Sequence, residues 1–170
     1  ALGGDIKVVQ YGVNKGATFL ITISAQLPHF QLKADPGNVV DDLLADEEAL
    51  GGLHFLVVDD AIDNQLLIKY ILESKGAKVD VANSGVEALD MLEKLSYDLI
   101  LLDIQMPVMD GYQTLTLLRQ KGYQMPVVAV TAHAMGEDIQ RTKAAGFAHH
   151  LSKPLNFAEL FTVLSQLSTA

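Results

Sequence analysis

The chain has 170 residues, of which 49% are hydrophobic and 19% charged, so it can bury a core and does not belong to the disordered class. It contains no cysteine, which excludes disulfides, thiolate metal sites and cysteine nucleophiles. The net charge of −9 at pH 7, without a basic stripe, argues against nucleic-acid binding, and apolar runs such as residues 99–102 are far too short to span a bilayer.

Residues 1–29 are predicted to form a β-hairpin. Two stretches, residues 6–11 and 18–23, are rich in β-branched and aromatic side chains, and residues 12–16 between them have turn composition. Because an isolated hairpin is marginal in water, we expect its apolar side chains to pack on the rest of the chain or on another chain, or else the segment to be mobile. The chain starts at Ala1 inside this pattern, without a signal peptide, and we interpret it as a fragment of a longer protein.

Residues 30–52 are predicted to be a linker that ends in Gly51 and Gly52. Within residues 31–52, six acidic side chains stand against Lys33 alone, so this stretch supplies −5 of the net charge. A solvated acidic connection is the expected state, although Asn38 is a candidate N-cap for one short helix.

Residues 53–170 alternate between strand-like and helix-like patterns. Three of the strands are continuous apolar runs, which is typical of strands buried on both faces, and Gly76, Gly122 and Gly146 stand where helices should end. The predicted strands are residues 55–58, 77–81, 99–102, 127–130 and 147–151, and the predicted helices are residues 62–75, 84–95, 112–121, 135–145 and 155–168. Five such units predict an α/β fold with a doubly wound parallel sheet and helices on both faces.

Ionisable or hydroxyl side chains follow four of the predicted strands. Asp59 and Asp60 follow the first strand, Asp103 the third, Thr131 the fourth and Lys153 the fifth. Sites in doubly wound sheets form at the carboxyl ends of the strands, so we expect these five side chains to converge on one edge. Each alone has an ordinary explanation as a helix-start, turn, strand or surface residue, but the combination favours a functional site.

Three neighbouring carboxylates repel one another and resist joint ionisation. A hard cation relieves this repulsion, and a ligand set made only of oxygen favours Mg²⁺. Asp103 can then act as a nucleophile towards phosphorus and form an acyl phosphate. Thr131 can donate a hydrogen bond to one phosphoryl oxygen, and Lys153 can form an ion pair with another.

Residues 53–170 resemble the receiver domain of two-component response regulators over essentially their whole length. The resemblance rests on residues 57–60 (VVDD), 101–111 (LLDIQMPVMDG), 130–132 (VTA) and 152–154 (SKP), which occur in the family's order and at its spacing. It implies a flavodoxin-like fold with five parallel strands in the order 2-1-3-4-5, here preceded by the hairpin. It also implies a cis bond between Lys153 and Pro154, which is uncommon for an ordinary X–Pro bond.

By this resemblance, Asp103 is the phosphoacceptor, and Thr131 and Lys153 bind the phosphoryl group. Mg²⁺ is the implied cofactor. The implied metal ligands are Asp60, Asp103 and the backbone carbonyl of Gln105, with Asp59 acting mainly through water. The phosphoryl group would come from the phosphohistidine of a kinase and pass to a histidine phosphotransfer protein, which in this family docks at the start of the first helix. Such a domain catalyses its own modification and turns over no free substrate, so the label enzyme fits it poorly.

Residues 1–29 resemble the last two strands of a histidine kinase ATP-binding domain, on residues 3–8 (GGDIKV) and 15–23 (KGATFLITI). A hairpin of this kind, a linker and then a receiver follow the order of a hybrid sensor histidine kinase. The resemblance implies a cytoplasmic location and a parent protein that can be anchored in the inner membrane. The fragment itself is expected neither to bind ATP nor to contact the membrane.

Two features depart from the family pattern. Three residues before Lys153 the family has Tyr or Phe, an aromatic switch that swings inward when Thr131 moves, and this chain has His150 instead. Gln105 and His133 occupy positions that tune acyl-phosphate hydrolysis in the family.

Other functions are open as alternatives. A pseudo-receiver would keep the fold and only bind partners. A hydrolase of the haloacid-dehalogenase type is disfavoured, because Gln105 stands where that class needs a second Asp. A zinc site at His133, His149 and His150 is also disfavoured, because neighbouring residues on a strand point to opposite faces.

Some apolar side chains are expected to be structural. On the first predicted helix, Leu66, Tyr70 and Ile71 should face mostly the core, while Ile62 stays exposed beside the site. Met106 and Met109 are expected to pack within their loop.

Overall fold

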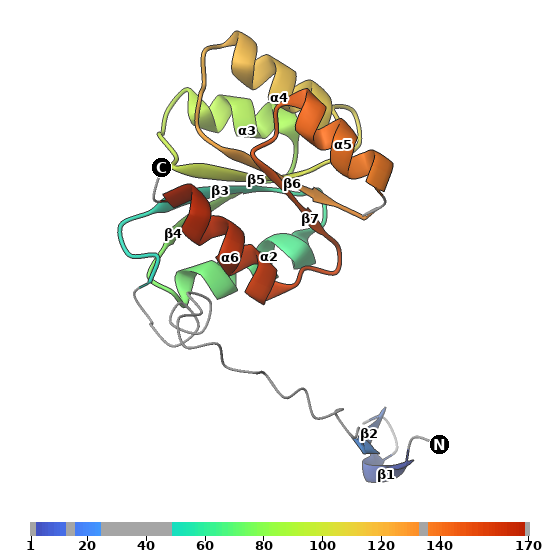
Figure 1. Ribbon diagram of the computed structural model, residues 1–170. Helices are drawn as coiled ribbons and strands as arrows, with labels where there is room; N and C mark the ends of the chain where they lie inside the picture. Colours follow the sequence, from blue (N-terminus) through green and yellow to red (C-terminus); the bar gives the residue numbers. More distant parts are fainter. Residues whose placement is uncertain (1–2, 13–15, 25–48, 133–135, 169–170) are drawn as a thin grey trace, which may run out of the picture. The chain divides into compact units, whose positions relative to one another are not determined.

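The computed structural model describes residues 3–12, 16–24, 49–132 and 136–168 (Figure 1). The chain divides into two units, Ala1–Pro36 and Gly37–Ala170. Within the described ranges, no helix is long and apolar enough to cross a membrane.

The first unit contains the predicted hairpin. β1 (Gly3–Gly12) pairs antiparallel with β2 (Gly16–Ser24). The register shifts between Val8 and Gln10, so one residue of β1 is left without an opposite partner, as in a β-bulge. The packing of the hairpin's side chains and the short helix considered at Asn38 lie outside the part of the chain that the structure describes.

The second unit contains a five-stranded parallel sheet in the order β4-β3-β5-β6-β7, which confirms the predicted order. Its strands are β3 (His54–Val58), β4 (Lys78–Ala82), β5 (Leu99–Asp103), β6 (Val127–Thr131) and β7 (His149–Ser152). Every residue of β5 and β6 is buried, as expected for continuous apolar strands between two helical layers.

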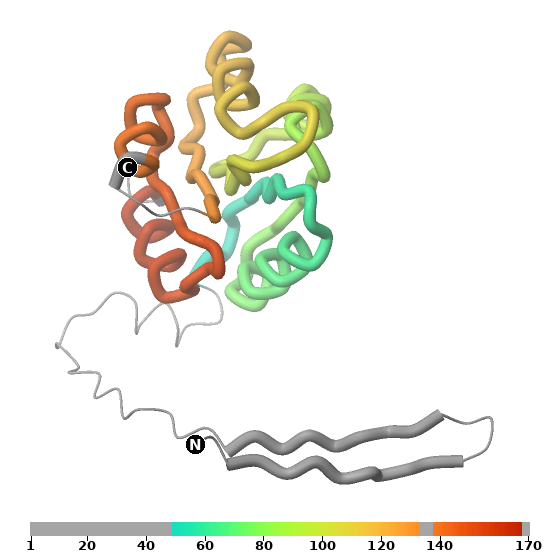
Figure 2. The backbone as a smooth tube through the Cα atoms, turned by 90° about the vertical axis from the view of Figure 1, so that its right-hand side faces the viewer, coloured from blue at the N-terminus to red at the C-terminus, as the bar shows by residue number. Residues whose placement is uncertain are grey.

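Helices cover both faces of this sheet (Figure 1). One face carries α2 (Ile62–Glu73) and α6 (Phe157–Ser168), and the other carries α3 (Gly85–Leu92), α4 (Gly111–Gln120) and α5 (Gly136–Ala145). In the view turned by 90°, the helices surround the central strands (Figure 2).

Each face of the sheet has its own apolar core. Leu101 belongs to the core on the α2 and α6 side, with Leu72 and Phe161, whereas its neighbour Leu102 belongs to the opposite core, with Leu118. This alternation follows from the strand geometry, in which successive side chains point to opposite faces. The two cores hold the carboxyl ends of the strands in a fixed register.

The predicted glycine stops are confirmed. Gly76, Gly122 and Gly146 have φ of +82°, +89° and +96°, a left-handed backbone that favours glycine and ends a helix. At the other end of α4, Asp110 and Gln113 form a capping box that satisfies backbone groups of the first turn.

Leu66 and Tyr70 were predicted to face the core, but they are 57% and 71% exposed, so the prediction was wrong for these two residues of α2. The residues that α2 buries are instead Gln65, Ile68 and Leu72. A polar residue therefore occupies an inward position that the apolar pattern could not identify. The expectations for Ile71, which packs partly buried against the core, and for Ile62, which is 61% exposed, are confirmed.

The packed core also begins upstream of residue 53. Leu50, which lies in the range assigned to the linker, is only 2% exposed and belongs to the core on the α2 and α6 side. Its backbone N–H donates a hydrogen bond to the carbonyl of Lys75 over 2.8 Å. The last residues before β3 are thus part of the folded α/β unit.

Candidate phosphoacceptor site

The carboxyl edge of the sheet gathers the predicted site residues. Asp59 directly follows β3, and Asp103, the last residue of β5, lies opposite Val130, one residue before Thr131 on β6. The side chains of Asp59, Asp103 and Thr131 are buried, whereas Asp60 is exposed. The edge is therefore a partly closed polar pocket, which we call the acidic pocket.

The ammonium group of Lys153 lies between the two buried carboxylates. Its Nζ is 2.6 Å from Asp103 Oδ2 and 2.8 Å from Asp59 Oδ2. The backbone N–H of Lys153 donates to the carbonyl of Thr131 over 2.7 Å, which ties the segment after β7 to the end of β6. The bond between Lys153 and Pro154 is cis, as the resemblance predicted.

Two residues of α2 that the sequence analysis did not identify hold Asp59. The side-chain amide of Asn64 donates to both Asp59 carboxylate oxygens, at 3.2 and 3.1 Å. The buried amide of Gln65 donates to the Asp59 carbonyl and to the carbonyl of Ala82 over 3.2 Å, which links the ends of β3 and β4. The signal that could have found them is their place in the first two turns of the helix that starts beside Asp59.

Asp103 is held by its own loop. The backbone N–H of Gln105 donates to Asp103 Oδ1 over 2.9 Å. The start of α4 packs directly on this loop, because a Cβ at Gly111 would lie 2.5 Å from the Asp103 carbonyl oxygen and 2.8 Å from the Cα of Ile104. Glycine at position 111 therefore permits this close approach.

In the acidic pocket, burial and the ion pairs shift the pKa values of Asp103 and Lys153 in opposite directions. Burial raises the pKa of Asp103 above its usual value, and the hydrogen bonds from Lys153 and from the Gln105 N–H only partly offset that rise. Burial also disfavours the charged form of Lys153, but its hydrogen bonds to Asp103 and Asp59 outweigh this, so the pKa of Lys153 is raised. The lysine is therefore a permanent cation at neutral pH.

The acidic pocket has the chemistry of a site for a hard cation. Carboxylate oxygens of Asp59, Asp60 and Asp103 all lie within 4.8 Å of one another. An all-oxygen donor set of this kind can bind a divalent metal ion. A cleft of about 110 Å³ opens beside Asp59 and Lys153, with Leu67 and Leu155 among its apolar lining residues.

The family model of the response regulator receiver domain matches residues 55–165. The chain belongs to this receiver domain family. Sensor histidine kinase GacS of Pseudomonas protegens is 34% identical over 165 residues, a match that covers 85% of this chain but only 18% of GacS. The present chain thus spans less than a fifth of that relative's length, and the receiver is one part of a larger protein there.

Solved receiver structures have the same fold. The receiver domain of the Francisella response regulator 1452 matches with a TM-score of 0.65 and 31% identity, over 68% of this chain and 96% of that one. The receiver domain of the histidine kinase CKI1 from Arabidopsis thaliana, in complex with Mg²⁺ and BeF₃⁻, matches with a TM-score of 0.61 and 29% identity. This match covers 75% of the present chain and 97% of the CKI1 chain.

The two histidines of β7 have nearly parallel rings, with centroids 5.5 Å apart. Nδ1 of His149 lies 2.8 Å from the backbone oxygen of His150. His150, which stands at the position of the family's aromatic switch, is half-buried, and His133 lies outside the described residues.

Proposed function

We propose that this receiver accepts a phosphoryl group from a phosphohistidine onto Asp103, with Mg²⁺ as cofactor, and passes it to a histidine phosphotransfer partner. The observation that carries the proposal is the ammonium of Lys153, held 2.6 Å from Asp103 and 2.8 Å from Asp59. A cation at this point can bind an oxygen of a phosphoryl group as it arrives at Asp103.

In the transfer, a carboxylate oxygen of Asp103 forms a bond to phosphorus while the bond between phosphorus and the imidazole nitrogen breaks. The nitrogen keeps the electron pair of the broken bond, and a proton from solvent restores the neutral imidazole. Lys153 and Thr131 bind the phosphoryl oxygens, over which negative charge is spread in the transition state. The reverse transfer, to a histidine of the next protein, uses the same contacts.

We assign the Mg²⁺ site to Asp59, Asp60 and Asp103, with the backbone carbonyl of Gln105 as a further ligand. The close approach of the three carboxylates in this chain supports the assignment. The related CKI1 receiver, which was solved with Mg²⁺ and BeF₃⁻, supports it too. When bound, the ion supplies positive charge that offsets the charge of the carboxylates and of the phosphoryl oxygens.

Incubation with acetyl phosphate and Mg²⁺ tests the proposal. The intact chain should gain the mass of one phosphoryl group, and EDTA should abolish the gain. The Asp103→Asn variant should gain nothing, because an amide cannot form the acyl phosphate. If the wild-type chain gains no mass, the alternative of a pseudo-receiver that acts only through protein contacts is favoured. If Asp103→Asn gains as much as wild type, Asp103 is not the phosphoacceptor.

An apolar stripe on α2 supports the assignment of a protein partner. Ile62, Leu66 and Tyr70 are spaced four residues apart, lie on one side of the helix and are 61%, 57% and 71% exposed. The stripe starts at the end of α2 that adjoins the acidic pocket. We propose that it contacts the histidine phosphotransfer protein. Serine at all three positions should slow transfer to that protein and leave labelling by acetyl phosphate intact; equal slowing of both would contradict this.

We further propose that the parent protein is a hybrid sensor histidine kinase, with residues 1–29 as the end of its ATP-binding domain and residues 30–52 as a linker. The match to GacS covers 85% of the chain, whereas residues 53–170 make up only about 69% of it, so the similarity extends upstream of the receiver. Because such a kinase uses ATP, we propose a cytoplasmic location. A coding sequence upstream of Ala1 without ATP-binding motifs or a phosphorylatable histidine would refute this origin.

A further inference from the structure

The loop after Asp103 contains a strained turn at Val108. The backbone φ of Val108 is +69°, and the N–H of Met109 donates to the carbonyl of Pro107 over 2.8 Å. This hydrogen bond closes a three-residue γ-turn with Val108 at its centre. A positive φ at the central residue defines the rare, strained form of the γ-turn. A β-branched residue is a poor occupant of this turn, because its Cβ crowds the neighbouring carbonyl.

The rest of the loop is anchored at both ends. The side chain of Met106 is buried on the α3 and α4 side of the sheet. At the far end, the N–H of Gly111 donates to the carbonyl of Ile104 over 3.0 Å, and the carboxylate of Asp110 caps α4. These contacts hold the loop on both sides of the turn at Val108.

No burial within the free receiver offsets this strain. Val108 is 99% exposed, so its isopropyl group is in water. Gly or Asn would adopt the same backbone at lower cost. A single exposed apolar side chain needs no explanation by itself, but one held on strained backbone beside a nucleophile points to a contact made elsewhere.

The position of Val108 identifies what makes that contact. Transfer from phosphohistidine brings the donor nitrogen to within a few ångströms of the Asp103 carboxylate, so the donor domain must cover the surface around it. A small transient interface of about 600 Å² per partner has a radius of about 14 Å. Gly111 lies directly against the backbone of Asp103, and Val108 is three residues before Gly111, so Val108 lies within about 11 Å of Gly111 even if the chain between them were fully extended.

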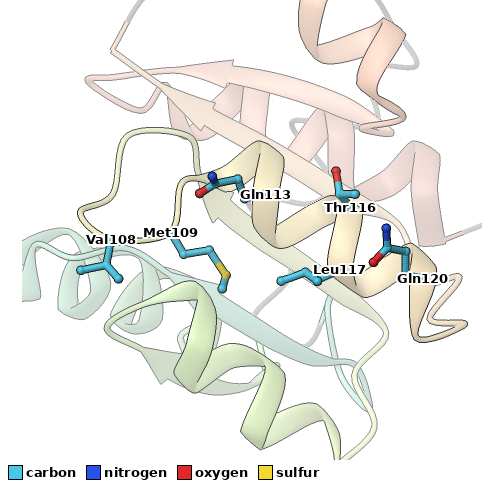
Figure 3. Close-up of a pocket in the computed structure, with 6 residues that line it drawn as sticks. All are labelled: Val108, Met109, Gln113, Thr116, Leu117 and Gln120. Carbon is cyan, nitrogen blue, oxygen red and sulfur yellow. The ribbon is translucent and has the colours of Figure 1, made fainter.

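We propose that Val108 is a specificity-determining docking residue that inserts into an apolar recess of the phosphohistidine-bearing partner; this rests on the proposed function. Behind Val108, a hollow of about 450 Å³ runs along the outer side of α4. Figure 3 shows the partly buried side chains of Met109 and Leu117 pointing toward each other in this hollow. An apolar side chain of the partner can therefore lie against them while Val108 is covered.

The test compares two donors on Val108→Asn. One donor is phosphoramidate, which reports on the chemistry at Asp103 without a protein partner. The other is a phosphorylated histidine phosphotransfer domain, chosen from a panel as the one that transfers fastest to the wild-type chain. The variant should lose about tenfold in the second-order rate constant with the domain, as expected for removal of one buried apolar side chain, and its thermal unfolding temperature should rise.

The matched control is Leu95→Asn, which removes an exposed apolar side chain, 44% accessible, from the loop at the opposite end of the sheet. It should leave both rates unchanged. An equal fall of both rates in Val108→Asn, or no fall with the domain, overturns the docking role while the proposed function stands. If no domain of the panel labels the wild-type chain faster than phosphoramidate does, the proposed function and the docking role both fall.

Discussion

Lys153 is the cation that two buried carboxylates share, so its removal should destabilise the fold. The side chains of Asp59 and Asp103 are 2% and 3% exposed and that of Lys153 is 24% exposed. In Lys153→Met both carboxylates lose this partner. We expect the free energy of unfolding in EDTA to fall by about 3 kcal/mol, the lower end of the range for broken buried pairs, because the lysine is partly solvated. Urea unfolding measures the loss.

Lys121→Met is the matched control for this prediction. Lys121 also forms a short ion pair, 2.6 Å from Glu93, but both partners are about half exposed. Loss of the ion pair between Lys121 and Glu93 should leave the free energy of unfolding nearly unchanged, because solvent screens an exposed pair. Addition of Mg²⁺ should restore part of the stability of Lys153→Met; equal losses in the two variants would show that burial does not set the strength of the Lys153 pairs.

Asp103 should lower the stability of the receiver at neutral pH. Burial raises its folded-state pKa above the unfolded value of 3.8, so the ionised form is the one that the fold disfavours. This cost is present at pH 7 and is gone below pH 3.8, where the carboxyl group is protonated in both states. Asp103→Asn should thus be more stable than wild type at pH 7 in EDTA, with an advantage that shrinks toward pH 4. Denaturant unfolding at several pH values measures the difference in free energy of unfolding between the variant and wild type. A difference that stays constant with pH would contradict the prediction.

The acidic pocket was predictable at residue scale because its members follow predicted strands. Asp59 and Asp103 could be placed at one edge from the strand pattern alone. The position of Asn64 and Gln65 in the first two turns of α2 places them near Asp59, but their contacts were not predictable, because the sequence left the rotation of this helix about its axis undetermined. Strand periodicity likewise does not encode the contact between Nδ1 of His149 and the backbone oxygen of His150.

At the scale of elements, α2 shows how far an apolar pattern can mislead. Its apolar residues lie on more than one side, so two inward faces were compatible with the sequence. The structure buries the face with Gln65, whose amide bonds to backbone carbonyls at the ends of β3 and β4. The strands, by contrast, were predicted closely, because β5 and β6 are continuous apolar runs with no competing face.

Two leucine variants of α2 test the face that the structure assigns. Leu72 is fully buried, and Leu66 is 57% exposed. Leu72→Ala should lower the free energy of unfolding by about 3 kcal/mol, since it leaves a cavity in the core. Leu66→Ala should change it by less than about 0.5 kcal/mol, as is usual at the surface. If Leu66→Ala lowered the free energy of unfolding strongly and Leu72→Ala only weakly, α2 would bury the face that was expected from the sequence.

At the scale of the whole molecule, composition shifts located the folded unit but did not identify Leu50, one of the first residues that the structure describes in it, as part of the core. The acidic run and Gly51-Gly52 marked a linker, yet one apolar residue before the glycines packs into the core. Leu50 stands between the acidic residues 46–48 and the pair Gly51-Gly52, and no apolar periodicity there indicates an inward side chain. Its hydrogen bond to the carbonyl of Lys75 joins residues that are far apart in the chain.

Truncation tests where the receiver unit begins. A chain of residues 49–170 keeps every described residue of the core that includes Leu50, and we expect it to unfold with the same free energy as residues 37–170. A chain of residues 53–170 should lose about 2–3 kcal/mol, the transfer free energy of one buried leucine with the cavity that it leaves. Leu50→Ala in the longer chain should reproduce most of this loss, which would assign it to the side chain and not to the shorter terminus. If residues 53–170 were as stable as the longer chains, the core would close without Leu50, and the unit would begin at β3.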